Sequence, residues 1–392
     1  MKWRWQRAPG GGGGGGGGRD KAAATGAPAL FRQLRPLFVV LQLHGVLPVT
    51  LDGATGPVLR WRSPAAVLAL AVWLGLVVVS VFIVDAQVRL LQRASALRMP
   101  FYEQVVQFMG TFAAVYLVMM PVVWYETRAP CAFLRSWRAV EADYAALCGR
   151  RLRVRVRVRC WLCVAGVMSI TAPLSTGVLL LMREEVHRMM VLAQYNAFMV
   201  GVPMLWSCLC HALAQASAAL AATLAEVPVD RAAVRAHAAI WNRLNEAIVA
   251  LGSRWGKTIS SFMMIVYVQW LVSAFTMMSV LLTGVGLNHI LLMSAIAALS
   301  FFLIYLPCNG AQYAVDAVGC RSRDALLRLP TCRMDEKALE EVALLLDNIR
   351  SGSKDAVNVN GVVGLNRAFF VAFLKSSATY LVVLVQFATS TS

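Results

Sequence analysis

The residues of this chain that could do chemistry are its cysteines, its histidines and one glycine–lysine segment. Cys160 and Cys163 are two residues apart, which is the spacing of redox pairs and of half a zinc site. The pair opens a hydrophobic stretch, however, and two cysteines cannot complete a tetrahedral zinc site. We therefore interpret both cysteines as packing residues.

The segment GSRWGKT at 252–258 has the glycines and the lysine of a phosphate-binding loop, but three residues between its glycines instead of four. We interpret Lys257 as an anchor at the inner end of a membrane helix. The five histidines are scattered, and no His-Glu-x-x-His or Gly-x-Ser-x-Gly motif occurs. Asp85 and Glu103, the acidic residues nearest the apolar stretches, lie at their outer ends. The sequence thus predicts no enzyme, no metal site and no cofactor.

The elements that must position these residues are apolar. Hydrophobic residues make up 59% of the chain and charged residues 15%, whereas soluble domains carry about 25% charged residues. A membrane-spanning helix needs roughly 20 mostly apolar residues. Seven such segments occur, at 65–86, 104–124, 160–182, 190–212, 259–284, 288–308 and 364–387. They predict an all-α membrane protein with seven transmembrane helices.

The basic residues orient these helices. Of 37 lysines and arginines, 30 fall in the N-terminal segment and in the loops on the same side of the membrane, five fall on the other side, and two fall in the seventh span. Because loops rich in lysine and arginine stay in the cytosol, the N-terminus is expected inside and the C-terminus outside. This orientation disfavours a G-protein-coupled receptor, whose N-terminus is extracellular. It also accounts for the net charge of +17 without a nucleic-acid partner.

The inner side is expected to carry a helical platform. Residues 231–251 are helical in pattern and could continue into the fifth span. Residues 334–350 form an amphipathic helix whose apolar stripe would pack on other cytosolic helices. That stripe comprises Leu339, Val342, Ala343, Leu346 and Ile349. We divide the chain into a disordered glycine-rich arm (1–28), six spans with their cytosolic extensions (29–330), and a cytosolic helix with the seventh span (331–392).

Arginine and apolar residues alternate in RRLRVRVRVRC at 150–160. A period of two suits a strand or a nucleic-acid-binding ribbon. The place of the segment before the third span favours a different role, in which the arginines anchor lipid headgroups. Each would contribute about 1 kcal/mol near an anionic membrane surface.

The last span carries a polar stripe. At 100° per residue, Thr379 and Gln386 share one face, and Ser376, Val383 and Ser390 lie on or near it. Polar side chains on a span face other helices or water rather than lipid. Two interpretations stay open: hydrogen bonds between helices of one subunit, or a pore formed where several subunits bring this helix to a shared axis.

The segment TYLVVLVQF at 379–387 resembles the C-terminal signature of insect gustatory receptors. Gly361, Val362, Val363, Leu365, Asn366 and Arg367 fit the residues that precede this signature, and 36–49 is similar to the family's short helix before the first span. The resemblance implies a plasma-membrane, ligand-gated, non-selective cation channel that assembles as a homo- or hetero-tetramer. Its seventh helix would line the pore, and a small-molecule tastant would bind among spans one to six. A G-protein-coupled-type receptor and a membrane transporter stay as alternatives.

Carried onto this chain, the resemblance implies roles for particular residues. Val383, Gln386 and Phe387 are expected at the pore or gate, and Thr379 and Tyr380 are expected to orient the helix. Leu381 stands where sweet-clade receptors have a glutamate, so fructose-type, bitter-type and orphan members stay open. Lys375 is expected to reach away from the conduit. The polar and aromatic residues expected to bind the ligand are Gln107, Phe108, Thr171, Tyr195, Asn196, Gln269, Trp270 and Phe275.

Overall fold

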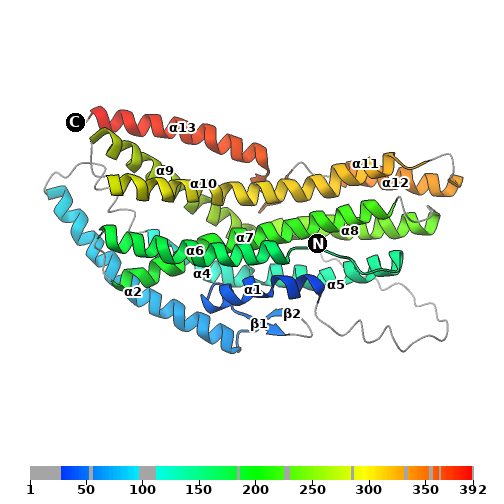
Figure 1. Ribbon diagram of the computed structural model, residues 1–392, viewed down its shortest axis with the longest axis horizontal. Helices are drawn as coiled ribbons and strands as arrows, with labels where there is room; N and C mark the ends of the chain where they lie inside the picture. The colour runs from blue at the N-terminus through cyan, green and yellow to red at the C-terminus, as the bar shows by residue number, and fades with distance from the viewer. Residues whose placement is uncertain are drawn as a thin grey trace.

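The computed structural model describes residues 28–52, 56–96, 112–182, 186–224, 230–283, 287–330, 334–352, 356–361 and 363–390. The predicted glycine-rich arm lies outside them. Most helices run along the longest axis of the molecule, and the C-terminal helix lies at one edge of the bundle (Figure 1). The described part of the chain is mostly helical, with two short two-stranded hairpins.

Seven helices overlap the seven predicted spans in the sequence. They are α2 (Pro64–Ala96), α4 (Phe112–Glu126), α6 (Arg157–Met182), α7 (Val186–Thr223), α9 (Gly256–Thr283), α10 (Leu287–Asp316) and α13 (Arg367–Ser390). Within the described residues, five segments are long and apolar enough to cross a membrane. These are Pro64–Ala86, Ala193–Thr223, Gly256–Ser279, Ile290–Leu327 and Arg367–Gln386. Part of the predicted second span, before Phe112, lies outside the described residues.

A second group of helices, which we call the platform, continues the bundle beyond one end of α13 (Figure 1). It consists of α5 (Arg128–Cys148), α8 (Arg231–Arg254), a π-helical turn η1 (Ala317–Arg321), α11 (Ser322–Leu327) and α12 (Glu336–Gly352). The ends of α7 and α10 run into it. The prediction of helices over 231–251 and 334–350 is confirmed by α8 and α12.

The predicted packing face of α12 is wrong by a fraction of a turn. The buried residues are Ala338, Val342, Leu345 and Ile349, whereas Leu339 is 43% exposed and Ala343 is also exposed. Three consecutive leucines at 344–346 allow more than one apolar stripe on this helix. Packing against α8 and α11 selects the stripe that contains Leu345.

The helix over 231–251 does not continue into the fifth span. Helix α8 ends at Arg254, α9 begins at Gly256, and the fully buried Trp255 stands between them. A Cβ atom on Gly252 would lie 2.5 Å from the Asn358 carbonyl oxygen, and one on Gly256 would lie 2.7 Å from the Asn360 amide nitrogen. The two glycines of GSRWGKT therefore let a hairpin approach this elbow closely, which is a structural use of the motif.

That hairpin and a second one were not predicted. Strands β3 (Val357–Val359) and β4 (Val363–Leu365) pair antiparallel between α12 and α13. Strands β1 (Val49–Asp52) and β2 (Gly56–Leu59) pair antiparallel before α2. Strands of three or four residues are too short to display a reliable alternating pattern.

The short helix before the first span is present, with different bounds. Helix α1 covers Ala29–Leu43 and not 36–49, because residues 46–48 are non-helical and β1 follows. The Glu141 carboxylate on α5 accepts hydrogen bonds from the Ala29 and Leu30 amides at 3.2 and 3.3 Å. This contact satisfies two amides at the start of the helix that have no partner within it. Burial raises the pKa of Glu141, and these two amides act in the opposite direction.

Candidate ligand and pore site

One face of α13 packs on α9 and α10 through aromatic rings. The Phe373 ring centroid lies 5.1 Å from that of Tyr267 and 5.6 Å from that of Trp270, both on α9. The Phe370 ring lies 5.1 Å from Phe301 on α10. Such edge-to-face pairs add to the stabilisation that apolar burial provides. These rings hold α13 to its own bundle.

The predicted polar stripe lies on the other, uncovered face of α13. Ser376, Thr379, Val383 and Gln386 are all exposed in the single chain, and Val383 is 39% exposed. The Thr379 hydroxyl donates a hydrogen bond to the Lys375 carbonyl oxygen of the same helix at 3.3 Å. Ser376 reaches toward a neighbouring helix, through the Tyr267 hydroxyl at 3.5 Å.

The structure gives the exposure of two further predicted residues of this helix and leaves a third side chain undescribed. Tyr380, expected to pack and orient α13, is 55% exposed in the single chain. Lys375 is exposed on the same uncovered side. Phe387 belongs to α13, but its side chain lies outside the described ones.

The N-terminal end of α13 is fixed by polar contacts. Asn366 accepts a hydrogen bond from the Phe369 amide at 2.7 Å, as an N-cap residue does. The Arg367 guanidinium donates to the Asn309 amide oxygen on α10 at 3.0 Å. The helix therefore starts at a defined point beside β4.

Two of the predicted ligand-binding residues meet between α7 and α9. The Tyr195 hydroxyl donates a hydrogen bond to the Gln269 amide oxygen at 2.7 Å. Tyr116 on α4, which the sequence reasoning missed, packs edge-to-face on Tyr195 with ring centroids 6.3 Å apart. Its only sequence signal is a phenol in the middle of an otherwise apolar span. Asn196 is also buried, next to Tyr195 in the chain.

Buried polar atoms without partners occur on α4, α7 and α9, the helices that carry Tyr116, Tyr195 and Gln269. Within the described residues, no hydrogen-bond partner exists for the hydroxyls of Tyr116, Ser273 and Thr276 or for the Gln194 amide oxygen. Gln269, Ser273 and Thr276 recur at the spacing of one helical face on α9. A buried polar atom without a partner is costly, and a ligand or an ordered water accounts for it best.

The other predicted ligand-binding residues divide into three groups. Trp270 faces α13 through Phe373, and Phe275 is 1% exposed on α9. Thr171 belongs to α6, although its side chain lies outside the described ones. Gln107 and Phe108 lie outside the described residues. The structure therefore brings together Tyr195 and Gln269, and it separates them from Trp270.

The cysteine pair and the glycine–lysine segment have structural roles. Cys160 and Cys163 are buried on α6, and the Cys163 sulfur lies 3.8 Å from the Cys208 sulfur on α7. Within the described residues, no three His, Cys, Asp or Glu side chains are grouped as a metal site would require. The Glu126 carboxylate at the end of α4 accepts hydrogen bonds from the Lys257 and Thr258 amides at 3.2 and 2.7 Å. Glu126 thus occupies the helix terminus where a phosphate would bind in a true phosphate-binding loop.

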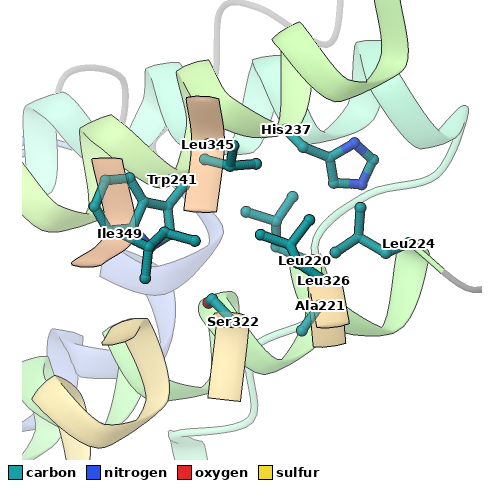
Figure 2. A pocket seen from close by; sticks show the side chains of 9 residues that line it. All are labelled: Leu220, Ala221, Leu224, His237, Trp241, Ser322, Leu326, Leu345 and Ile349. Atoms are coloured by element: carbon teal, nitrogen blue, oxygen red, sulfur yellow. The ribbon is translucent and has the colours of Figure 1, made fainter. Parts of the chain in front are cut away.

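A small pocket lies within the platform (Figure 2). Residues of α7, α8, α11 and α12 line it, and its interior of about 20 Å³ has room for a water molecule. Leu220, Trp241 and Leu345 form apolar walls, and His237 and Ser322 supply polar groups. The pocket is therefore too small for a tastant.

His237 is tied to two helices at the edge of that pocket. Its Nδ1 lies 2.8 Å from the Ala233 carbonyl oxygen, and its Nε2 lies 3.0 Å from the Thr223 hydroxyl at the end of α7. Because a carbonyl only accepts, Nδ1 carries the proton in the neutral ring. The Thr223 hydroxyl donates its single proton to the Leu220 carbonyl oxygen at 2.6 Å, so its contact with Nε2 is secondary. Burial lowers the pKa of His237, and the hydrogen bond to Ala233 partly offsets this effect.

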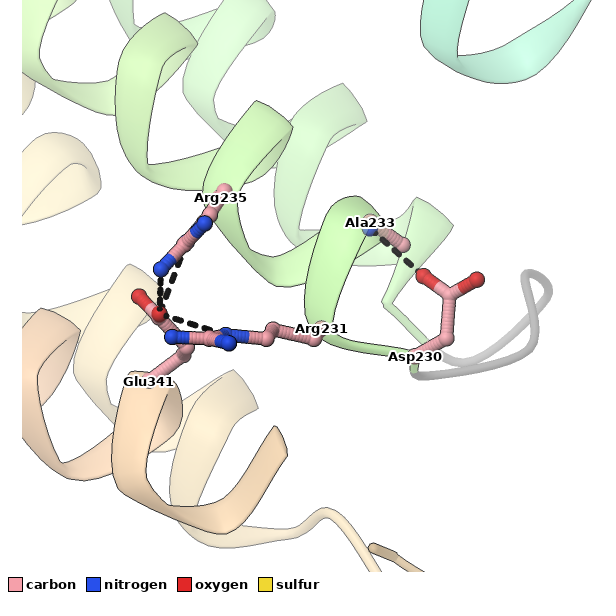
Figure 3. Close-up of polar contacts among 5 residues, drawn as sticks. All are labelled: Asp230, Arg231, Ala233, Arg235 and Glu341. Carbon is pink, nitrogen blue, oxygen red and sulfur yellow. Dashed lines mark hydrogen bonds and ion pairs between the residues drawn. The ribbon is translucent and has the colours of Figure 1, made fainter. Parts of the chain in front are cut away.

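An ion pair joins α8 to α12 on the surface of the platform (Figure 3). The Glu341 carboxylate contacts the guanidiniums of Arg231 and Arg235 at 3.1 and 2.6 Å. The two arginines hold the pKa of Glu341 below its usual range, and Arg235 has the larger effect. Asp230 caps α8 by accepting from the Ala233 amide at 2.7 Å.

Comparison with known proteins agrees with this architecture. The gustatory and odorant receptor 24 of Anopheles gambiae is 25% identical over 94% of this chain and 80% of its own length. The gustatory and odorant receptor 22 of the same species is 22% identical over 92% of this chain and 78% of its own length. The structure of the olfactory receptor OR5 from Machilis hrabei in complex with eugenol superposes with a TM-score of 0.58. It is 11% identical and covers 91% of this chain and 98% of its own.

The family model described as 7tm chemosensory receptor matches residues 34–391. That match includes every spanning helix, the platform and the α13 stripe. The chain therefore belongs to the seven-transmembrane chemosensory receptor family, which is not a family of enzymes.

Proposed function

We propose that this chain is a subunit of a tastant-gated, non-selective cation channel in the plasma membrane. Four subunits, identical or mixed, assemble around a central axis, with the N-terminus in the cytosol and the C-terminus outside. Helix α13 lines the pore. The observation that carries this proposal is the uncovered stripe of Ser376, Thr379, Val383 and Gln386 on a helix whose opposite face is packed.

The stripe suits a conduit because polar residues alternate along it with an apolar one. A lipid-facing stripe would carry no amide or hydroxyl at these positions, because such groups are costly in hydrocarbon. Rings of Gln386 and Thr379 would offer oxygen atoms to a hydrated cation. A ring of Val383 between them would supply a hydrophobic constriction that controls wetting.

The tastant site in this proposal lies between α4, α7 and α9. The unpaired hydroxyls of Tyr116, Ser273 and Thr276 and the bonded pair Tyr195–Gln269 provide hydrogen-bonding groups among aromatic walls. Such a lining fits a small polar or amphipathic molecule. Because Gln269 and Trp270 are adjacent on α9, the site and the α13 contact share one turn of helix.

The proposal is tested by recording currents and topology in the same cells. Transfected cells that lack G-protein coupling should give a ligand-evoked current with a reversal potential near zero in mixed sodium and potassium solutions. An epitope tag placed before residue 28 should be stained only after the cells are permeabilised. Staining of intact cells, or ligand responses that require G proteins, would overturn the channel assignment.

A further inference from the structure

An extended segment between α5 and α6 carries a row of arginines outside the sites described above. Arg151, Arg153 and Arg155 are exposed, and the residues between and after them, Leu152, Val154 and Val156, are buried. Alternate residues of an extended chain project from the same side and repeat about every 6.6 Å. The exposed Arg157 follows at the start of α6, and Arg159 is turned about 200° from it around the helix axis. The alternation of the sequence thus produces one basic face and one apolar face.

Two glutamine side chains bind the backbone of this segment, as a neighbouring strand would do. The amide group of Gln33 on α1 donates to the Val154 carbonyl at 2.6 Å and accepts from the Val156 and Arg157 amides at 2.9 and 3.1 Å. Gln215 on α7 accepts from the Arg155 amide at 2.6 Å and donates to its carbonyl at 3.2 Å. The backbone beneath the arginines is therefore fixed on both sides.

The arginines of the row have no carboxylate partners in the described part of the chain. Three arginines of α8 are paired: Arg231 and Arg235 with Glu341, and Arg243 with Asp143. The sequence contains no acidic residue between Asp143 and Glu184. Five like charges on a fixed backbone produce a strong local positive potential that only an added anion can neutralise.

Membrane topology alone does not require this construction. The positive-inside effect depends on the number of arginines near a span, and a flexible loop would serve equally well. Guanidinium groups held in a fixed row are suited to phosphate oxygens, which they bind through paired N–H donors. Several guanidiniums in line favour an anion with several phosphates over a single phosphate.

We propose that the row Arg151, Arg153 and Arg155, with Arg157 after it, is a binding site for a multiply phosphorylated anion. The same chemistry is offered by a polyphosphorylated lipid headgroup and by a soluble polyphosphate. The assignment rests on the proposed topology, which places this segment on the cytosolic side. Gln215 also contacts His211 on α7 at 2.7 Å, and the His211 ring stacks on Tyr313 of α10. An occupant of the row therefore binds next to the inner ends of two spanning helices.

The test measures binding to the purified full-length receptor in detergent. Two fluorescent probes are used: a short-chain phosphatidylinositol bisphosphate and soluble inositol hexakisphosphate. The variant R151Q/R153Q/R155Q is compared with R328Q/K337Q/R350Q, which removes three exposed, unpaired charges that are scattered over the α11–α12 side of the platform. Elution of each variant as the intact assembly shows that it is folded.

We expect the row variant to bind at least roughly tenfold more weakly than wild type, because charge-assisted contacts to phosphate are lost. The matched control should bind as wild type does, and affinity should fall with rising salt. R153K keeps the charge but loses the paired donors, so its binding should fall between wild type and R153Q. Binding of the lipid probe alone identifies the headgroup as the occupant, and binding of both probes shows that a soluble anion suffices.

Equal losses in both triple variants would reduce the effect to net charge and overturn the site, as would failure of wild type to bind either probe. Ligand-evoked current is measured separately for the same variants. Row-dependent binding in a receptor that conducts no current would sustain the site and count against the channel. A conducting receptor that binds neither probe would sustain the channel and overturn the anion site.

Discussion

The Tyr195 hydroxyl donates a hydrogen bond of 2.7 Å to the Gln269 amide oxygen, and the residue after Gln269 contacts α13. Trp270 lies against Phe373 of α13 with ring centroids 5.6 Å apart. One turn of α9 therefore joins α7 to α13. A ligand that competes for Tyr195 or Gln269 would alter the position of Trp270, and through it α13. This contact chain gives the proposed channel a physical route from ligand site to pore.

Loss of either partner of this hydrogen bond should impair activation. We expect Tyr195→Phe and Gln269→Leu each to raise the half-maximal ligand concentration by roughly five- to thirtyfold, because each leaves one buried polar group unpaired. The double variant removes both polar groups, so its loss should be smaller than the sum of the single losses. Dose–response curves at matched surface expression measure the three variants. Strict additivity would contradict a direct coupling.

The aromatic contact that holds α13 should be needed for stability and gating together. Phe373→Ala removes a ring that contacts Tyr267 and Trp270, at an expected cost of about 3–5 kcal/mol. Val371→Ala is the matched control, because Val371 is 48% exposed on the same helix. Thermal unfolding of the purified receptor and ligand-evoked current should both fall for Phe373→Ala and stay unchanged for Val371→Ala. Unaltered unfolding in the first variant would mean that the ring contact contributes little.

The helices of the fold could be predicted from the sequence, but the hairpins and the helix break at Trp255 could not. Apolar length placed the seven long helices, and amphipathic spacing predicted α8 and α12. The phase of α12 was wrong because Leu344, Leu345 and Leu346 offer neighbouring stripes, and only the packing partner selects one. The hairpins and the break at Trp255 depend on close backbone approach at Gly252 and Gly256, which no periodic pattern displays.

The candidate site was predictable only in part, for a related reason. Tyr195 and Gln269 are predicted because they are polar or aromatic residues in apolar spans, and they meet because α7 and α9 are in contact. Tyr116 has the same signal on α4 but is absent from the predicted set. The alternation at 150–160 suits a strand, but residues 151–156 form no strand and α6 begins at Arg157. The partners of this segment are the side chains of Gln33 and Gln215, which no sequence pattern indicates.

Glu126 should be a structural residue rather than a conduit charge. It is 6% exposed and receives the Lys257 and Thr258 amides, so it fixes the start of α9 against α4. Glu126→Ala should destabilise the receptor by about 1–3 kcal/mol, since two amides, of which that of Thr258 is buried, lose their acceptor. The exposed Glu246 on α8 provides the control Glu246→Ala. Thermal unfolding measures both, and equal stability of the two variants would exclude the capping role.

His237 should make platform stability depend on pH. Burial lowers its pKa below the ordinary value of 6.5, so the folded protein binds this proton less readily than the unfolded chain. The stability is therefore fully present above about pH 6.5 and decreases as the pH falls toward the lowered pKa. Between pH 7.5 and 5.5, the unfolding temperature of wild type should fall more than that of His237→Gln. Identical pH slopes for the two proteins would show that His237 does not cause the dependence.

The account is tested most directly by the accessibility of the α13 stripe to water in the open channel. Val383→Cys and Gln386→Cys place thiols on the stripe, and Ala378→Cys places one on an exposed part of α13 turned about 140° from Val383. A positively charged thiol reagent is applied from outside during ligand-evoked current, with wild type as the control for native cysteines. We predict irreversible loss of current in the two stripe variants, faster with ligand present, and no loss in Ala378→Cys or wild type. Unaltered current after modification at Val383→Cys and Gln386→Cys, or equal block at Ala378→Cys, would contradict a pore lined by this stripe.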